Sequence, residues 1–135
     1  MSEKKRGWKV VRVVADLLMS AMGDDGHRAI VSYEEGRETV PRKECGPLAV
    51  FKTYIDALDY TISISHYFMI DMEIHECEYV ESVDISMWYH CTDSMKPNTM
   101  TSTFLRHCPN GTVFANSIML GKRRKCVNVG VVEDG

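Results

Sequence analysis

The chain has 135 residues, 44% of them hydrophobic and 26% charged, with a formal net charge of −3 at pH 7. These proportions are typical of a folded globular domain and argue against disorder. No apolar run approaches the roughly 18 residues of a membrane span, and the N-terminus lacks the apolar core of a secretory signal. We therefore expect one cytosolic domain over residues 1–135, with a short basic N-terminal arm (1–6) and a charged C-terminal tail (121–135).

The charge is unevenly distributed along the chain. Residues 1–12 carry five basic residues against one acid, and residues 122–125 are all basic, whereas residues 71–84 hold six acids and no Lys or Arg. If the first and last strands lie together, one basic face opposes an acidic one. A basic face can hold phosphates despite a negative net charge, although solvated chain ends explain the same clusters.

The cysteines do not suggest a metal site. There are five, and no Cys-x-x-Cys spacing occurs, so neither a zinc knuckle nor a thioredoxin-type redox pair is indicated. His75 and Cys77 share one face if their segment is a strand. Reduced thiols in a cytosolic core explain the cysteines without a metal, and we expect no metal and no cofactor.

The first third of the chain has the pattern of short strands. β-branched and aromatic residues predict a strand at Trp8–Val14, and Leu17–Met22 either continues it or pairs with it. Gly23–Gly26 is a strong turn signal, so Arg28–Tyr33 is expected to return as the second arm of a hairpin. A short extended piece follows at Arg37–Pro41.

A buried strand at Leu48–Phe51 and one helix over residues 53–63 come next. Thr53 can serve as the N-cap of this helix, with Asp56 in its first turn. One apolar stripe at helical spacing is expected to face the sheet: Ile55, Leu58 and Ile62.

Strict alternation predicts another strand at Met72–Val80. Residues 81–108 show no dominant period, which suggests a functional loop or an undetected helix. The turn Pro109–Gly111 then leads into a last strand at Thr112–Leu120, ending at Gly121. The expected fold class is α+β, an antiparallel or mixed β-sheet with one main packing helix.

Catalytic motifs are absent from the sequence. There is no phosphate-binding G-x-x-x-x-G-K-[ST], no nucleophile elbow and no zinc-binding helix, and we assign no catalytic residues. His90, His107 and Asp93 could support a small phosphodiesterase only if the fold brings such groups within hydrogen-bond reach. Arginines beside turns and exposed aromatic rings remain, which suit phosphates and nucleobases. Trp88 is one candidate ring.

The order of short motifs adds a family resemblance. WKVVR, SAM, VSYEEG, GPLAVF with the following helix, HECEYV and PNGTVFANSIML succeed one another between Gly7 and Arg124. This order resembles small phage-encoded proteins that include the viral nucleotide sponges, which sequester the signals of anti-phage defence without cleaving them.

The resemblance implies a β-rich homo-oligomer in the host cytosol that binds cyclic oligonucleotides or cyclic ADP-ribose isomers, with no long nucleic acid and no membrane as partner. It points to these ligand-binding residues: Arg28, Tyr33, Arg37, Arg106 and Asn116. An aromatic residue is expected shortly after Gly36, where this chain has Glu38. Base stacking at that point is therefore not supported, and a different ligand is compatible with the change.

Three alternatives remain open at this stage. One is the nucleotide-degrading phosphodiesterase, which would return its ligand chemically altered. Another is a phage protein that binds a host protein through the acidic strand Glu73–Glu81. The last is a structural domain whose polar residues only face solvent.

Overall fold

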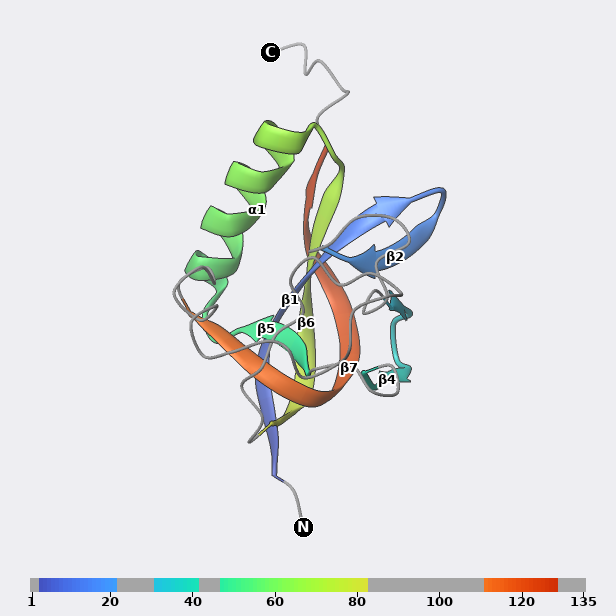
Figure 1. The fold of residues 1–135 in the computed structure, drawn as a ribbon, viewed down its shortest axis with the longest axis vertical. Coiled ribbons are helices and arrows are strands. Elements are labelled where there is room, and N and C mark those ends of the chain that lie inside the picture. The colour runs from blue at the N-terminus through green and yellow to red at the C-terminus, as the bar shows by residue number, and fades with distance from the viewer. Residues whose placement is uncertain (1–2, 22–30, 42–46, 83–110, 129–135) are drawn as a thin grey trace, which may run out of the picture.

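The computed structural model describes residues 3–21, 31–41, 47–82 and 111–128. The elements in chain order are β1 (Lys4–Val14), β2 (Leu17–Ser20), β3 (Ser32–Tyr33), β4 (Glu38–Thr39), β5 (Leu48–Phe51), α1 (Tyr54–Phe68), β6 (Met72–Glu81) and β7 (Thr112–Val127). All strands join one sheet, every described pairing in it is antiparallel, and α1 packs across it (Figure 1). The expected α+β class with one packing helix is confirmed.

Four of the strands close into a ring. β6 pairs with β1 along one edge and with β7 along the other, and β7 also pairs with β5. The ring closes where β5 meets β1, through the single pair Trp8↔Phe51. β2 pairs with the C-terminal part of β1, and β3 pairs with β2. β4 pairs with β7.

Two apolar cores form on the two faces of the sheet because strand side chains alternate. On β1, Val11 points into the ring and is fully buried, while Val10 points under α1. The core beneath the helix also contains Met72 and Ile74 of β6, both without exposed surface. Full burial of such a side chain contributes about 1.5–3 kcal/mol, so both faces of the ring stabilise the fold.

The helix begins as expected and ends later. Thr53 is the N-cap and accepts a hydrogen bond from the backbone N–H of Asp56, but α1 continues beyond Ser63 to Phe68. Met69, in the left-handed conformation with φ 55°, ends it by donating its backbone N–H to the carbonyl of Ser65.

The face of α1 that packs on the sheet differs from the expected stripe. Ile55 and Ile62 are 64% and 44% exposed, whereas Ala57, Thr61 and Ser65 have no exposed surface. These small side chains let the helix lie close to the sheet. The Thr61 hydroxyl is satisfied inside the helix, since it donates to the carbonyl of Ala57 at 2.7 Å. Of the predicted stripe, Leu58 packs against the core, but Ile55 and Ile62 were predicted wrongly, because small residues occupy the fully buried positions of the helix.

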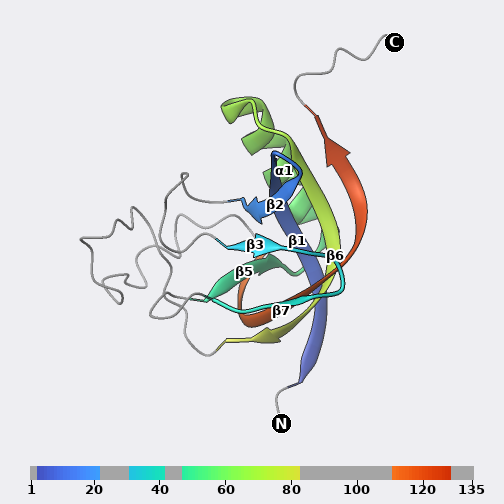
Figure 2. The same ribbon diagram turned by 90° about the vertical axis from the view of Figure 1, so that its right-hand side faces the viewer.

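The last strand is longer than expected. β7 continues through Gly121 and the basic residues 122–125 to Val127, so these residues belong to the sheet and not to a tail. Lys4–Arg6 of the expected N-terminal arm likewise belong to β1. Irregular pairing with β6 leaves extra residues on β7, which bends it around the ring (Figure 2).

The two basic segments do not form a face opposite the acidic one. The acidic strand β6 lies between basic β1 and basic β7, and charges pair across the strands. Lys5 Nζ lies 2.6 Å from Glu81 Oε1, and Arg123 lies 3.4 Å from Glu73 Oε2. Basic residues of the neighbouring strands thus pair with two carboxylates of β6, Glu73 and Glu81, which corrects the expectation of opposed faces.

The remaining expectations concern the first hairpins. Leu17–Ser20 pairs with β1 instead of continuing it, and Leu18 pairs with Tyr33 of β3. The turn expected at Gly23–Gly26 and the segment 83–108 lie outside the described residues. No helix in the part of the chain described is both long and apolar enough to cross a membrane.

Candidate functional site

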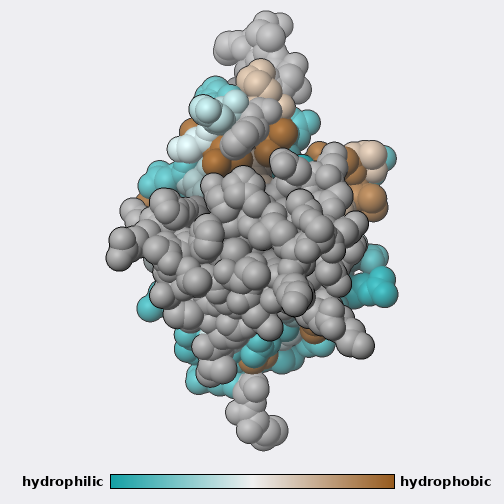
Figure 3. Space-filling view, viewed as in Figure 1, coloured by the Kyte–Doolittle hydropathy of each residue, from teal (hydrophilic) through white to brown (hydrophobic). Residues whose placement is uncertain are grey.

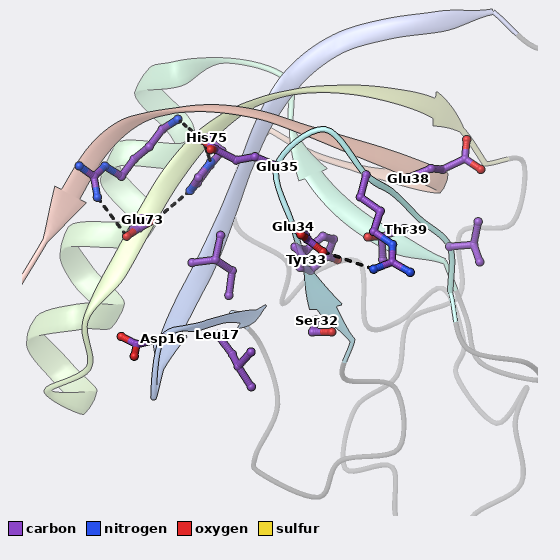
Figure 4. Close-up of a pocket in the computed structure, with 14 residues that line it drawn as sticks. Asp16, Leu17, Ser32, Tyr33, Glu34, Glu35, Glu38, Thr39, Glu73 and His75 are labelled. Atoms are coloured by element: carbon purple, nitrogen blue, oxygen red, sulfur yellow. Dashed lines mark hydrogen bonds and ion pairs between the residues drawn. The ribbon is translucent and has the colours of Figure 1, made fainter.

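A cleft of about 1180 Å³ opens between the turns of β1–β2 and β3–β4 and the strands β6 and β7 (Figure 4). Its described lining comes from five places in the sequence: Asp16, Leu17, Leu18, Ser32, Tyr33, Glu34, Glu35, Arg37, Glu38, Thr39, Val40, Glu73, His75 and Arg123. The cleft exists because β3 and β4 leave the ring while β6 and β7 curve behind them.

The turn between β3 and β4 is fastened to β7. Gly36 has φ 78°, which glycine adopts without strain, and its backbone N–H donates to the carbonyl of Leu120 at 2.7 Å. The Glu35 carboxylate accepts the backbone N–H of Arg123 at 3.2 Å. These bonds hold Glu34, Glu35 and Arg37 along the cleft.

Carboxylates outnumber guanidinium groups in the described lining. Five acids are present: Asp16, Glu34, Glu35, Glu38 and Glu73. The two arginines are each paired, Arg37 with Glu34 at 3.3 Å and Arg123 with Glu73 at 3.4 Å. The side chains of the Arg37 pair are 77% and 69% exposed, so this ion pair is weak and a ligand can replace it at little cost.

His75 is buried at the back of the cleft, where it joins three elements. Its Nε2 lies 2.8 Å from a carboxylate oxygen of Glu73, and its Nδ1 lies 3.0 Å from the carbonyl oxygen of Gly121 and 3.5 Å from Glu35. These neighbours are all hydrogen-bond acceptors, so both ring nitrogens are occupied by contacts within the protein. His75 therefore ties β6 to β7 and to the β3–β4 turn, and neither nitrogen is available to activate a nucleophile.

Tyr33 forms the inner wall of the cleft. It is only 5% exposed, and its hydroxyl has no hydrogen-bond partner among the described residues. Burial raises the pKa of Tyr33, and the neighbouring Ser20 hydroxyl partly opposes this rise. The Ser20 hydroxyl itself bonds to the backbone N–H and carbonyl of Val31. Behind the ring lies the Lys9 ammonium, 5.0 Å from the ring centroid.

Of the site residues expected from the sequence, two come together here. Tyr33 and Arg37 both line the cleft. Asn116 does not; it is an exposed residue at an irregularity of β7. Arg28, Trp88 and Arg106 lie outside the described residues, as do His90, Asp93 and His107 of the phosphodiesterase alternative.

Sequence reasoning missed the residues that the sheet brings to the cleft from β6 and β7, namely Glu73, His75 and Arg123. It also missed Lys9, which was counted with the basic N-terminal cluster. The alternation of β1 contained the signal, because Lys9 shares its strand face with buried Gly7 and Val11.

A second cavity of about 730 Å³ lies on the other side of the β3–β4 turn, with Gly7, Trp8, Cys77 and Lys122 among its lining residues. Glu35 is the one described residue that borders both cavities. The turn is therefore the partition between them.

No three metal-ligating side chains gather among the described residues. The expected shared face of His75 and Cys77 is confirmed, since both are buried, but no such group forms around them.

The chain matches no protein-family model, no curated protein and no solved structure. Its function is therefore inferred from the residues of the cleft.

Proposed function

We propose that the protein is a binding protein that sequesters a ribose-containing nucleotide signal in the cleft and does not cleave it. The observation that supports this most directly is the cleft itself. It joins a buried tyrosine hydroxyl that has no partner among the described residues, two arginines and a carboxylate-rich rim. Neither ring nitrogen of His75 is available as a base, so its contacts favour binding over catalysis. Such a protein would act in the cytosol of a phage host, as the resemblance implies.

The lining charge favours one ligand class over another. Carboxylates accept hydrogen bonds from ribose hydroxyls, and arginines grip phosphate oxygens in pairs. A cyclic ADP-ribose isomer joins its riboses through one diphosphate and offers more hydroxyls per phosphate than a cyclic oligonucleotide does. An acidic rim with two arginines suits the former, so we expect cyclic ADP-ribose isomers to bind more tightly.

The first experiment measures the melting temperature with a panel of cyclic ADP-ribose isomers and cyclic di- and trinucleotides. A ligand at 100 times its Kd adds about 2.7 kcal/mol, which raises the melting temperature by several degrees for a chain of this size. The bound ligand is then released by heat and identified by chromatography. Intact ligand supports sequestration, altered ligand establishes the phosphodiesterase alternative, and no shift across the panel overturns the proposal.

Two substitutions test the roles of the rim. Arg37→Ala removes a phosphate donor and is expected to weaken binding about 10- to 100-fold, since a charged hydrogen bond contributes about 1.5–3 kcal/mol. Glu38→Gln distinguishes the two ligand classes. It is expected to weaken the binding of a cyclic ADP-ribose isomer held through its ribose hydroxyls, and to strengthen the binding of a cyclic oligonucleotide, whose phosphates the Glu38 carboxylate repels. Arg124→Ala, an exposed arginine outside the described lining, is the matched control and leaves the affinity unchanged.

The acidic rim also favours a second candidate, a basic segment of a host protein. β6 has both edges paired, so such a partner would contact side chains and not the strand backbone. This candidate predicts that a lysine-rich peptide binds, that Glu38→Gln weakens it and that nucleotides have no effect.

We further infer that the protein forms a homo-oligomer through the outer face of α1. Three large apolar side chains are exposed there and at its C-terminal end: Ile55, Ile62 and Met69. Hydrophobic surface is visible along the helix and at the tip of the β1–β2 hairpin (Figure 3). Light scattering behind a sizing column tests this, and Ile55→Ser with Ile62→Ser is expected to yield monomers.

A further inference from the structure

Lys9 is a buried cation without a counter-ion among the described residues. It is 6% exposed, points into the strand ring, and forms no ion pair in the part of the chain described. Its ammonium has three N–H groups, and one donates to the carbonyl of Ala49 at 2.6 Å. The face of the Tyr33 ring, 5.0 Å away, supplies the other described contact.

Stability does not explain a lysine at this position. Removing an ammonium from water costs several kcal/mol, and one hydrogen bond with one ring contact returns only part of it. An apolar side chain of similar length would fill the same space without that cost. A charged residue on a core-facing position that breaks the pattern of its strand is expected at a functional site.

Tyr33 connects this cation to the cleft. Its ring covers the Lys9 ammonium, and the same residue lines the cleft. Two neighbouring side chains, both more than nine-tenths buried, are thus left with polar hydrogens that no described residue accepts. One is cationic and one is a hydroxyl, and both are donors that suit a single anionic oxygen.

We propose that Tyr33 and Lys9 form an oxyanion subsite at the inner end of the cleft, in which the Tyr33 hydroxyl donates to a phosphate oxygen and the Lys9 ammonium supplies the positive charge. The inference deepens the proposed function on which it rests: the rim accepts hydroxyl groups, and the inner wall receives the phosphate. It also explains how an acid-rich cleft can hold an anionic ligand.

The titratable groups around Lys9 differ in pKa, so the titration of Lys9 can be followed separately. Desolvation by burial lowers the pKa of Lys9 to about 8. Burial raises the pKa of Cys77 on β6 to about 12 and also raises those of Tyr33 on β3 and Tyr79 on β6. The core residues on β2, β5 and β7 that share this interior are apolar. Lys9 is therefore the group of this cluster that we expect to titrate in the folded protein between pH 7 and 10.

The test follows Lys9 itself by NMR with sulfate as the probe. Sulfate resembles phosphate but keeps its charge across this pH range. Side-chain signals of the lysines are titrated from pH 6.5 to 9.5 with and without sulfate, at constant ionic strength, and Lys9→Met assigns the Lys9 signal. We expect sulfate to raise the pKa of Lys9 by about one unit, which corresponds to a tenfold loss of sulfate affinity once Lys9 is deprotonated.

Tyr33→Phe is the decisive variant, because it keeps the ring against Lys9 and removes only the donor. It is expected to abolish the sulfate effect without lowering the melting temperature, since the lost hydroxyl has no described partner. Lys4→Met, an exposed lysine on the same strand, is the control for a general loss of charge and keeps the effect.

An unchanged Lys9 titration in sulfate overturns the inference, as does a shift that persists in Tyr33→Phe. The outcome is separate from that of the proposed function. If sulfate shifts Lys9 but no nucleotide binds, the subsite is supported and the proposed ligand is wrong. If a nucleotide binds without raising the pKa of Lys9, the subsite is wrong and the binding function remains.

Discussion

At the scale of single residues, the turn between β1 and β2 carries backbone strain. Ala15 and Asp16 form a two-residue loop between the pair Val14↔Leu17, and their φ values are 48° and 68°. Such a hairpin turn needs positive φ at both positions and is usually made by Asn and Gly. Leu17 and Asp16 line the cleft, so the site retains the unfavourable turn.

Ala15→Gly is expected to raise the free energy of unfolding by about 0.5–1 kcal/mol, because glycine adopts positive φ without the steric cost of a Cβ. Urea denaturation monitored by circular dichroism measures the change. Gly36→Ala is the reciprocal control: φ there is 78° and no atom lies within 4 Å of an added Cβ. Gly36→Ala is expected to lose stability through backbone strain alone. A gain in the stability of Gly36→Ala would contradict this account of the turn.

At the scale of elements, the side of α1 that faces the sheet is the side with small residues. A fully buried Ala57 with Thr61 and Ser65 brings the helix axis near the sheet, while Ile55 and Ile62 remain outside. Trp8 packs against the first turn of the helix, edge-to-face with Tyr54 at 5.1 Å. The helix is therefore fixed by its small residues and by aromatic contacts at its start.

Ala57→Leu is expected to destabilise the protein by about 1–3 kcal/mol, since added methylene groups have no space in that contact. Ile55→Ala, which removes as many carbon atoms from the exposed face as Ala57→Leu adds to the buried one, is expected to change stability by less than about 0.5 kcal/mol. Thermal unfolding of both variants at low protein concentration checks the pair. Equal losses would show that Ile55 also contacts the sheet, contrary to its exposure in the structure.

The elements that the sequence could predict are those with local signals. Leu48–Phe51 and the cap at Thr53 were identified correctly, because an apolar run and a capping residue act over a few residues. The extension of β7 past Gly121 was missed, because a run of Lys and Arg resembles a solvated end unless its acidic partner strand is known.

The residues of the candidate site also differ in how far the sequence alone could indicate them. Tyr33 and Arg37, to which the resemblance pointed, lie on either side of a tight turn and both line the cleft. Glu73 and Arg123 meet only through the register of β6 with β7, 50 residues apart, and no local pattern specifies that register.

At the scale of the whole molecule, buried Lys9 and Cys77 both make stability depend on pH above neutrality. The pKa of Lys9 falls from 10.5 to about 8 on folding. Above pH 8 the unfolded chain keeps a proton that the folded protein loses, so stability rises with pH. The pKa of Cys77 rises from 9 to about 12, so above pH 9 the unfolded chain loses a proton that the folded protein keeps, and the two effects oppose each other.

We expect the free energy of unfolding to rise between pH 8 and 9, by at most about 1.4 kcal/mol, and then to level off or fall. Urea denaturation at half-unit pH intervals measures the profile. Lys9→Met should be more stable than the natural chain at pH 7 and should lack the rise. The Lys5–Glu81 pair raises the pKa of Lys5, so its stabilising effect persists through this range and decreases only at higher pH. A steady decline of stability from pH 8 in the natural chain would contradict the burial of a charged Lys9.

The position of β6 between β1 and β7 has a consequence for the newly made chain. During synthesis β1 is available to pair with β6 as soon as β6 appears, but the opposite edge must wait for β7. An unpaired edge next to apolar Ile74 and Tyr79 is a template for aggregation. Glu76 and Glu78 lie exposed on that strand, and like charges on an open edge repel other copies. The exposed carboxylates of β6 that form no cross-strand ion pair with a described residue, Glu76 and Glu78, are therefore expected to protect the unfinished sheet from aggregation.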